Sequence, residues 1–194
     1  MVSVPFSFLH GVRSTHRVIA LGGLIYSPMQ TSDQRVLRHL AATLAYRAAK
    51  VLREVPPSFA SYRCGESTRT PLQIVAHLAD LMAWGTSIAR GGYEWKAGGS
   101  DDWATEVDRF FAGLDALDTA LAAEDFAGSI DKLIQGPLAD ALTHVGQLAM
   151  LRGMAGVPVR PESYAKATIS IGRVGRDQAA AGREFDGDAS APRS

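Results

Sequence analysis

The sequence predicts an all-α protein: a four-helix bundle with an irregular N-terminal extension and a C-terminal tail. Four segments of roughly 18 to 23 residues place apolar side chains at intervals of three and four, as in amphipathic helices that face a core. No segment shows a convincing strand pattern. The apolar share of 46% among 194 residues allows one substantial core, so we expect a single domain over residues 31–160.

The first predicted helix covers about residues 32–54. Asp33 lies in its first turn, where a carboxylate favours the helix dipole, and Pro56-Pro57 end it. His39 and Tyr46 flank its apolar stripe. The residues of that stripe, which we expect to be buried, are Val36, Leu40, Leu44, Ala48 and Val51.

The second predicted helix covers about residues 70–90. Thr70 and Gln73 form a capping box, Pro71 occupies the first helical position, and the glycines at 91–92 end the helix. The side chains expected to face the core are Ile74, Leu78, Leu81 and Ile88. The adjoining seam is formed by His77, Asp80 and Trp84.

Two further helices follow a glycine-rich loop, residues 91–101, that contains Tyr93 and Trp95. The third covers about residues 102–123 and has the most regular stripe: Val107, Phe110, Leu114, Leu117 and Leu121. A connector over residues 130–137 leads to the fourth helix, which runs to about residue 155 and is followed by Gly156, a natural left-handed cap. The fourth helix is expected to pack inward through Leu138, Leu142, Val145 and Leu148 or Ala149.

Residues 1–30 and 161–194 are expected to lie outside the helical domain. A basic stretch precedes the apolar run of residues 18–26, as in a signal peptide, but the run is short and no small-residue cleavage site follows. We interpret residues 1–30 as an extension that is disordered or lies upstream of a true start at Met29; an export signal and a packed segment are the alternatives. Residues 161–194 predict an irregular segment, with residues 164–171 extended or lying along the helices, and a disordered tail from about residue 182.

Composition disfavours several classes of partner. Twenty basic residues balance twenty acidic ones, so there is no basic stripe for nucleic acid or an anionic membrane. No run approaches the roughly 20 apolar residues that span a bilayer. Cys64 is the single cysteine, which excludes an internal disulfide and fits a reducing, cytoplasmic compartment. We interpret Cys64 as structural or incidental rather than as a nucleophile.

Three side chains form a candidate metal site: His77, Asp140 and His144. Residues four apart share one face of a helix, so Asp140 and His144 point the same way and Gln147 continues their stripe. Helix bundles build ligand sites from side chains on facing helices, and two imidazoles with one carboxylate can hold a divalent ion while leaving positions open. The same spacing also allows core histidines and an Asp140 that only interacts with the helix dipole.

The neighbours of these residues have two interpretations each. Asp80 orients the His77 imidazole or is an exposed helix carboxylate. Gln147 hydrogen-bonds a ligand or, as we favour, braces its helix. Arg152 interacts with the helix dipole or lies on the surface. Three further side chains line a pocket above the metal or, as is more usual, belong to the core or its rim: His39, Tyr46 and Trp84.

Three segments resemble the DinB-like superfamily: residues 70–80 (TPLQIVAHLAD), 140–148 (DALTHVGQL) and 151–158 (LRGMAGVP). The resemblance covers about residues 30–160 and implies a four-helix bundle with a divalent ion held by three histidines. His77 and His144 match the first and last of these positions, whereas Asp140 stands where the family has a histidine. A carboxylate is an acceptable ligand for Zn, Ni, Fe or Mn, so the identity of the implied ion stays open.

The resemblance also implies metal-dependent chemistry on a small molecule, in some relatives with a low-molecular-weight thiol. A metal ion with an open coordination position lowers the pKa of a thiol or water that binds there. We therefore expect a thiol-transferase or hydrolase, with catalytic residues unassigned, and a homodimer as in relatives. The alternative is a non-catalytic interaction or dimerisation module with a degenerate metal site. DNA binding, suggested only by the superfamily's damage-inducible name, is disfavoured by the charge balance.

Overall fold

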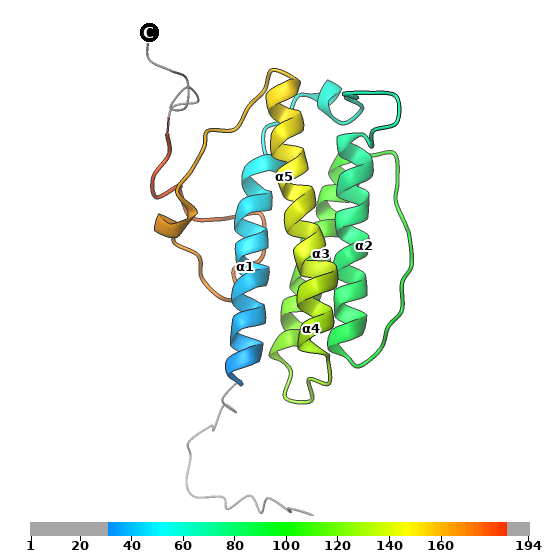
Figure 1. Cartoon of the computed structure of the whole chain (residues 1–194), viewed down its shortest axis with the longest axis vertical. Coiled ribbons are helices and arrows are strands. Elements are labelled where there is room, and N and C mark those ends of the chain that lie inside the picture. The colour runs from blue at the N-terminus through cyan, green and yellow to red at the C-terminus, as the bar shows by residue number, and fades with distance from the viewer. Residues whose placement is uncertain (1–30, 186–194) are drawn as a thin grey trace, which may run out of the picture.

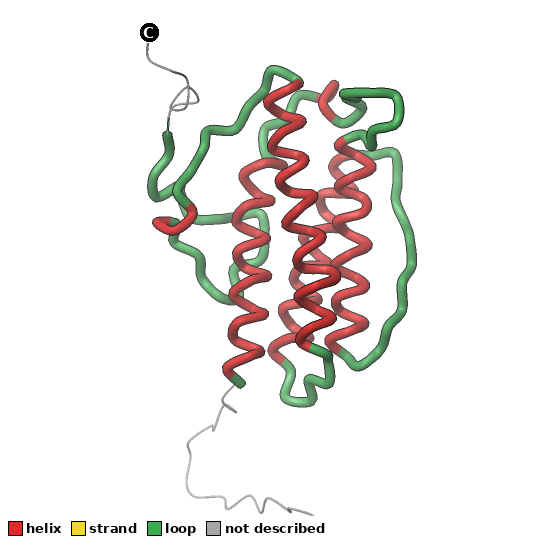
Figure 2. Tube along the Cα trace, in the orientation of Figure 1, coloured by secondary structure: helices red, strands yellow, loops and turns green. Residues whose placement is uncertain are grey.

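Four long helices account for most of the computed structural model, which describes residues 31–185 (Figure 1). They are α1 (Ser32–Leu52), α2 (Pro71–Ala89), α3 (Trp103–Ala122) and α5 (Ala139–Met154). The shorter elements are the 3-10 turns η1 (Pro57–Phe59) and η3 (Tyr164–Lys166), the helix α4 (Ile130–Leu133) and the π turn η2 (Ile134–Leu138). Residues 31–185 contain no strand, only an isolated bridge between Glu162 and Glu184, which confirms the all-α prediction (Figure 2).

Two predictions concern residues that the structure does not describe. The interpretation of residues 1–30 and the end of the predicted tail, residues 186–194, lie outside the described part of the chain. Among the helices within it, none combines the length and the apolar character that a membrane crossing requires.

Side-chain caps determine where the helices begin. The predicted box at α2 is confirmed: the Gln73 amide donates to Thr70 Oγ1 at 3.2 Å, and the Thr70 amide donates to Gln73 Oε1 at 2.9 Å. Thr31 and Gln34 form a second capping box at α1, which we did not predict. Each box satisfies two amides that would otherwise lack a partner and contributes about 1 kcal/mol. At the end of α5, Gly156 adopts the expected positive φ of 76°.

Helices α2 and α3 run parallel, which requires a long connection between them (Figure 1). The contacting residues advance in the same direction along both helices, from Asp80 with Arg109 to Gly85 with Leu117. The chain must therefore return along the whole of α2, a helix of 19 residues and about 29 Å. Residues 90–102 make this return as a crossover loop beside α2, and thirteen extended residues reach up to about 43 Å (Figure 2).

One hydrophobic core joins the long helices. The predicted core residues of α2 and α3 are confirmed as buried: Ile74, Leu78, Leu81, Ile88, Val107, Phe110, Leu114, Leu117 and Leu121. The prediction for Val36 was wrong, since its side chain is 60% exposed and Leu37 is buried instead. The buried stripe of α1 follows Leu37, Ala41, Leu44 and Ala48, which maintains the helical period, whereas Val36 is one residue out of phase.

The segment predicted to be a connector between α3 and α5 is largely helical. Ser129 caps α4, and Leu133, the last residue of α4, is fully buried. Gly136 departs from helical angles and forms a kink before α5. The six-membered ring of Trp84 occupies the space at this kink, because a Cβ on Gly136 would lie 2.9 Å from its edge. Only glycine lets α2 and the start of α5 approach this closely.

Residues 161–185 pack along α1 through a buried charge cluster. Lys50 Nζ donates to Glu162 Oε2 at 2.8 Å and to Glu184 Oε1 at 2.7 Å. The Tyr46 hydroxyl donates to the second oxygen of Glu162 at 2.6 Å. Burial and the Glu162 carboxylate raise the pKa of the Tyr46 phenol, so it stays a donor. Tyr46 therefore belongs to this cluster and not to a pocket above the predicted metal site.

Arg152 is buried, contrary to its interpretation as a surface residue. Its guanidinium donates to the carbonyls of Val51 and Arg53 at 3.2 and 2.8 Å and to that of Val157 at 2.8 Å. Val51 lies in the last turn of α1, and Arg53 and Val157 lie just beyond the ends of α1 and α5, where carbonyls have no helical hydrogen-bond partner. Arg152 thus joins the C-terminal ends of the two parallel helices α1 and α5.

We expect Gly136→Ala to lower the free energy of unfolding by about 1 to 3 kcal/mol, because the new methyl group would overlap the Trp84 ring. Gly146→Ala is the matched control on α5, where an added Cβ meets nothing within 4 Å. Because alanine favours a helix interior, this control should gain about 0.5 to 1 kcal/mol. Urea denaturation measures both; equal effects would contradict the described contact.

Candidate metal centre

The structure brings His77, Asp140 and His144 together between α2 and α5. His77 projects from α2, and the other two residues lie one turn apart on α5. One donor atom from each residue lies within 4.8 Å of the other two. All three predicted site residues therefore share one place in the fold.

The Asp140 carboxylate lies between the two imidazole rings. Its Oδ2 is 3.4 Å from Nε2 of His77, and its Oδ1 is 3.4 Å from Nε2 of His144. The two rings are perpendicular, with centroids 4.8 Å apart. His144 is buried, whereas the side chain of Asp140 is 44% exposed. The cluster is thus closed on the core side and open to solvent at the carboxylate.

Gln147 orients the His144 ring, which corrects the interpretation that it mainly braces α5. Nδ1 of His144 donates to Oε1 of Gln147 at 2.7 Å. An amide oxygen only accepts, so the proton resides on Nδ1 in the neutral ring. The lone pair of Nε2 then faces Asp140, which is the arrangement needed in a metal-ligating histidine.

The pKa of His77 lies below its usual value. Burial lowers it most, the neighbouring His144 lowers it further, and the positive charge of Arg69 adds to the effect. The hydrogen bond that the His77 ring can donate to Asp140 raises the pKa again without cancelling the shift. His77 is therefore neutral at pH 7, and a neutral imidazole is the form that binds metals.

The three donors fit a small divalent ion. Around an ion held tetrahedrally at about 2.1 Å, neighbouring donor atoms lie roughly 3.4 Å apart. Each imidazole nitrogen lies at this distance from a different oxygen of Asp140, and one donor atom from each residue lies within 4.8 Å of the other two, so small side-chain shifts would bring the three donors around one ion. Three protein ligands leave at least one position for water or substrate, as in catalytic rather than structural sites.

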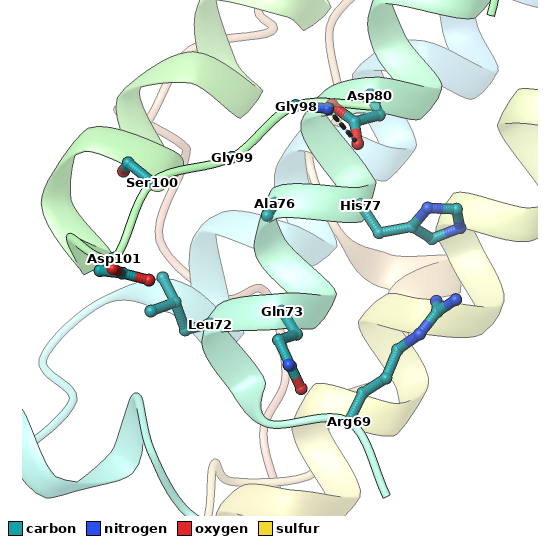
Figure 3. A pocket seen from close by; sticks show the side chains of 10 residues that line it. All are labelled: Arg69, Leu72, Gln73, Ala76, His77, Asp80, Gly98, Gly99, Ser100 and Asp101. Carbon is teal, nitrogen blue, oxygen red and sulfur yellow. Dashed lines mark hydrogen bonds between the residues drawn. The ribbon is translucent and has the colours of Figure 1, made fainter. Parts of the chain in front are cut away.

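Asp80 fulfils neither predicted role. It is buried and accepts a hydrogen bond from Nη1 of Arg109 at 2.6 Å, while both of its oxygens lie 3.1 Å from the amide nitrogen of Gly98 (Figure 3). Arg109 also pairs with Glu106, and Glu106 accepts from the Ser100 amide at 2.6 Å. Asp80 and Glu106 therefore fasten the crossover loop to α2 and α3.

The crossover loop contributes an aromatic side chain that sequence reasoning did not assign to the site. Trp95 packs edge-on against His77, with ring centroids 5.7 Å apart, and contacts Trp84 at the same distance. Tyr93 continues this row by packing on Trp84 at 5.4 Å. Two aromatic residues in a glycine-rich loop were the sequence feature that could have indicated this contact with the site. Trp84 thus reaches the site through Trp95, whereas His39 is exposed on α1 and lines no part of it.

Two cavities flank the cluster and share Arg69. The polar cavity, of about 440 Å³, extends from His77 along the crossover loop (Figure 3). Its lining residues are Arg69, Leu72, Gln73, Ala76, His77, Asp80, Gly98, Gly99, Ser100 and Asp101. The apolar cavity, of about 350 Å³, lies on the His144 side. Its lining residues are Cys64, Thr68, Arg69, Ile74, His144, Gln147, Met150 and Leu151.

Comparison with known proteins provides no relative. No protein-family model, curated protein or solved structure matches this chain. The function must therefore be argued from the residues and distances of the site.

We expect Asp80→Ala to destabilise the protein by about 2 kcal/mol, because it removes a charged hydrogen-bond partner from Arg109 and from the Gly98 amide. Hydrogen exchange at Gly98 should accelerate with it. Asp115→Ala, at an exposed position of α3, is the control and should stay within about 0.5 kcal/mol of the wild type. Unchanged protection of Gly98 would show that Asp80 does not hold the loop.

In metal-free protein, the lowered pKa of His77 predicts a loss of stability on acidification. The unfolded chain takes up the proton near pH 6.5, before the folded one does, so the free energy of unfolding falls as pH drops below about 6.5. The loss ends once pH has passed the pKa of the folded state. His77→Gln should show a smaller decrease between pH 7.5 and 5.5 in urea titrations; a larger one would contradict the direction of the shift.

Proposed function

We propose that this chain is a four-helix bundle of the DinB-like type that binds one divalent metal ion through His77, Asp140 and His144. We further propose that it is an enzyme that acts through this ion on a small molecule, as a thiol-transferase or hydrolase. The observation that carries the proposal is the convergence of these three donors, with His144 held in the metal-binding tautomer.

The arrangement of the helices supports the bundle. Four long helices lie side by side, and residues from each of them are buried in one core (Figure 1). The donors come from two facing helices, which is how bundles form their metal sites. The DinB-like pattern expects donors at these same three positions, and Asp140 supplies a carboxylate in place of an imidazole.

The chain's own residues prepare the site for such chemistry. When bound, the ion would act as a Lewis acid that lowers the pKa of a coordinated thiol or water. Asp140 contributes a negative charge and suits a borderline ion such as Zn, Ni, Fe or Mn. Gln147 holds the ring of His144, and Trp95 shields one edge of His77 from water. The flanking cavities give a substrate access to the cluster.

A second candidate is a non-catalytic module that forms a homodimer. Met150 and Met154 lie one turn apart on α5 and are 59% and 53% exposed. Exposed apolar side chains on one helix face favour association with another chain. The exposed carboxylate of Asp140, in a position where the DinB-like pattern has histidine, is compatible with a site that has lost its affinity.

Elemental analysis after metal-free purification and reconstitution tests the metal site. We expect about one ion per chain in the wild type and loss of this ion in His77→Ala and in His144→Ala. The control His39→Ala alters an exposed histidine and should keep the wild-type metal content. Gln147→Leu should weaken binding by roughly 10- to 100-fold, because the His144 ring is no longer oriented. A thermal-shift screen across Zn, Ni, Mn and Fe identifies the preferred ion, since a ligand of the folded state raises the melting temperature.

The same variants separate the two candidates. Metal-dependent transfer of a low-molecular-weight thiol, or hydrolysis, that disappears in folded His77→Ala protein supports the enzyme. A wild type that takes up no ion, combined with a dimer that Met150→Glu dissociates in light scattering, supports the non-catalytic module. Retention of a stoichiometric ion in both histidine variants would refute the metal site altogether.

A further inference from the structure

Arg69 is a cation beside the cluster that no acidic group holds. Within residues 31–185 its side chain makes no hydrogen bond or ion pair. Its backbone directly precedes Thr70, which the capping box fixes at the start of α2. The side chain extends from there toward the ring of His77 (Figure 3). An arginine in this position offers its guanidinium to whatever occupies the space next to the cluster.

The acidic groups around Arg69 are already engaged or distant. Asp140 lies between the two imidazole rings, and Asp80 is paired with Arg109. Asp101 lines the far side of the polar cavity, away from the guanidinium (Figure 3). With a divalent ion in the cluster, one carboxylate from Asp140 would face three positive charges. The site as a whole would therefore attract an anion.

The apolar cavity shows what should accompany that anion. Ile74, Met150 and Leu151 give it hydrocarbon walls, and no carboxylate lines it. A cationic group would meet no opposite charge there and would lie beside Arg69, so the lining disfavours amines. Its volume of about 350 Å³ lies near the lower end of the roughly 300 to 1,000 Å³ of ligand pockets, which indicates a small ligand.

We propose that the ligand of this site is a small organic carboxylate with an apolar body. Its carboxylate binds Arg69 beside the cluster, and its hydrocarbon part lies in the apolar cavity against Ile74, Met150 and Leu151. A planar guanidinium pairs with a carboxylate through two parallel hydrogen bonds, which fixes the direction of the ligand as well as its charge. The inference rests on the proposed function in placing this anion next to a metal ion; the contacts with Arg69 and the cavity do not depend on the metal.

Calorimetric titration of the metal-loaded full chain with octanoate, below its micellar concentration, tests the proposal. We expect octanoate to bind, acetate to bind at least about tenfold more weakly for want of an apolar body, and octylamine not to bind. Arg69→Gln should weaken octanoate about tenfold, while elemental analysis shows unchanged metal content. Arg90→Gln, which alters an exposed arginine at the other end of α2, is the matched control and should bind octanoate as the wild type does.

Cys64 supplies a second readout that does not need the metal. It is the only cysteine of the chain and lines the apolar cavity, so its alkylation by iodoacetamide reports occupancy there. Octanoate should slow the alkylation in wild type and much less in Arg69→Gln. If the chain takes up no metal but this protection persists, the proposed function fails and the inference stands. If metal binds but octanoate neither binds nor protects Cys64, the inference is wrong. It is also wrong if octylamine binds as tightly as octanoate, or if Arg69→Gln binds octanoate as tightly as the wild type.

Discussion

The close parallel packing of α2 on α3 is the constraint on which the site depends. A Cβ on Gly113 of α3 would lie only 2.8 Å from that of Met82, so the two helices approach as closely as their backbones allow. Two consecutive helices that run in the same direction cannot be joined by a tight turn. The crossover loop must therefore return along the pair. This path places Trp95 against His77 and the glycines at 98–99 beside α2. The wall of the polar cavity is thus a consequence of helix direction.

The register of α5 depends on a contact two turns from the cluster. Trp84 occupies the space left by Gly136 at the start of α5, and α5 runs antiparallel to α2. Seven residues back along α2, about 10 Å, lies His77. Asp140 and His144 follow Gly136 by four and eight residues, in the first turns of α5, and so lie on the stretch of α5 that faces His77. The aromatic contact therefore aligns three donors that it does not touch.

Local sequence patterns predicted the helices and the site triad, and contacts distant in sequence produced the rest. The 3.6-residue period and the Thr70 capping box are local, so the long helices and the start of α2 could be predicted, although the equally local box at Thr31 was missed. The spacing of Asp140 and His144 is equally local, and the His144–Gln147 pair three residues apart was available to the same reasoning. The partner of Asp80, in contrast, is Arg109 on another helix, and the pairing follows from a helix direction that periodicity does not encode. The prediction that Val36 is buried was wrong for a different reason. A shift of one residue along the helix separates the buried stripe, which contains Leu37, from an exposed position.

The position of α1 affects how the chain can be assembled as it leaves the ribosome. Of the helices in residues 31–185, α1 is synthesised first, yet it packs mainly on α3 and α5, and its Lys50 binds Glu162 and Glu184. At typical elongation rates, the roughly 130 residues between Leu52 and Glu184 take about 7 to 26 s to synthesise. Helices α2 and α3 are neighbours in sequence and can pair within that time. The apolar face of α1 stays exposed during this time. A chaperone bound to the nascent chain would cover it until the later helices emerge.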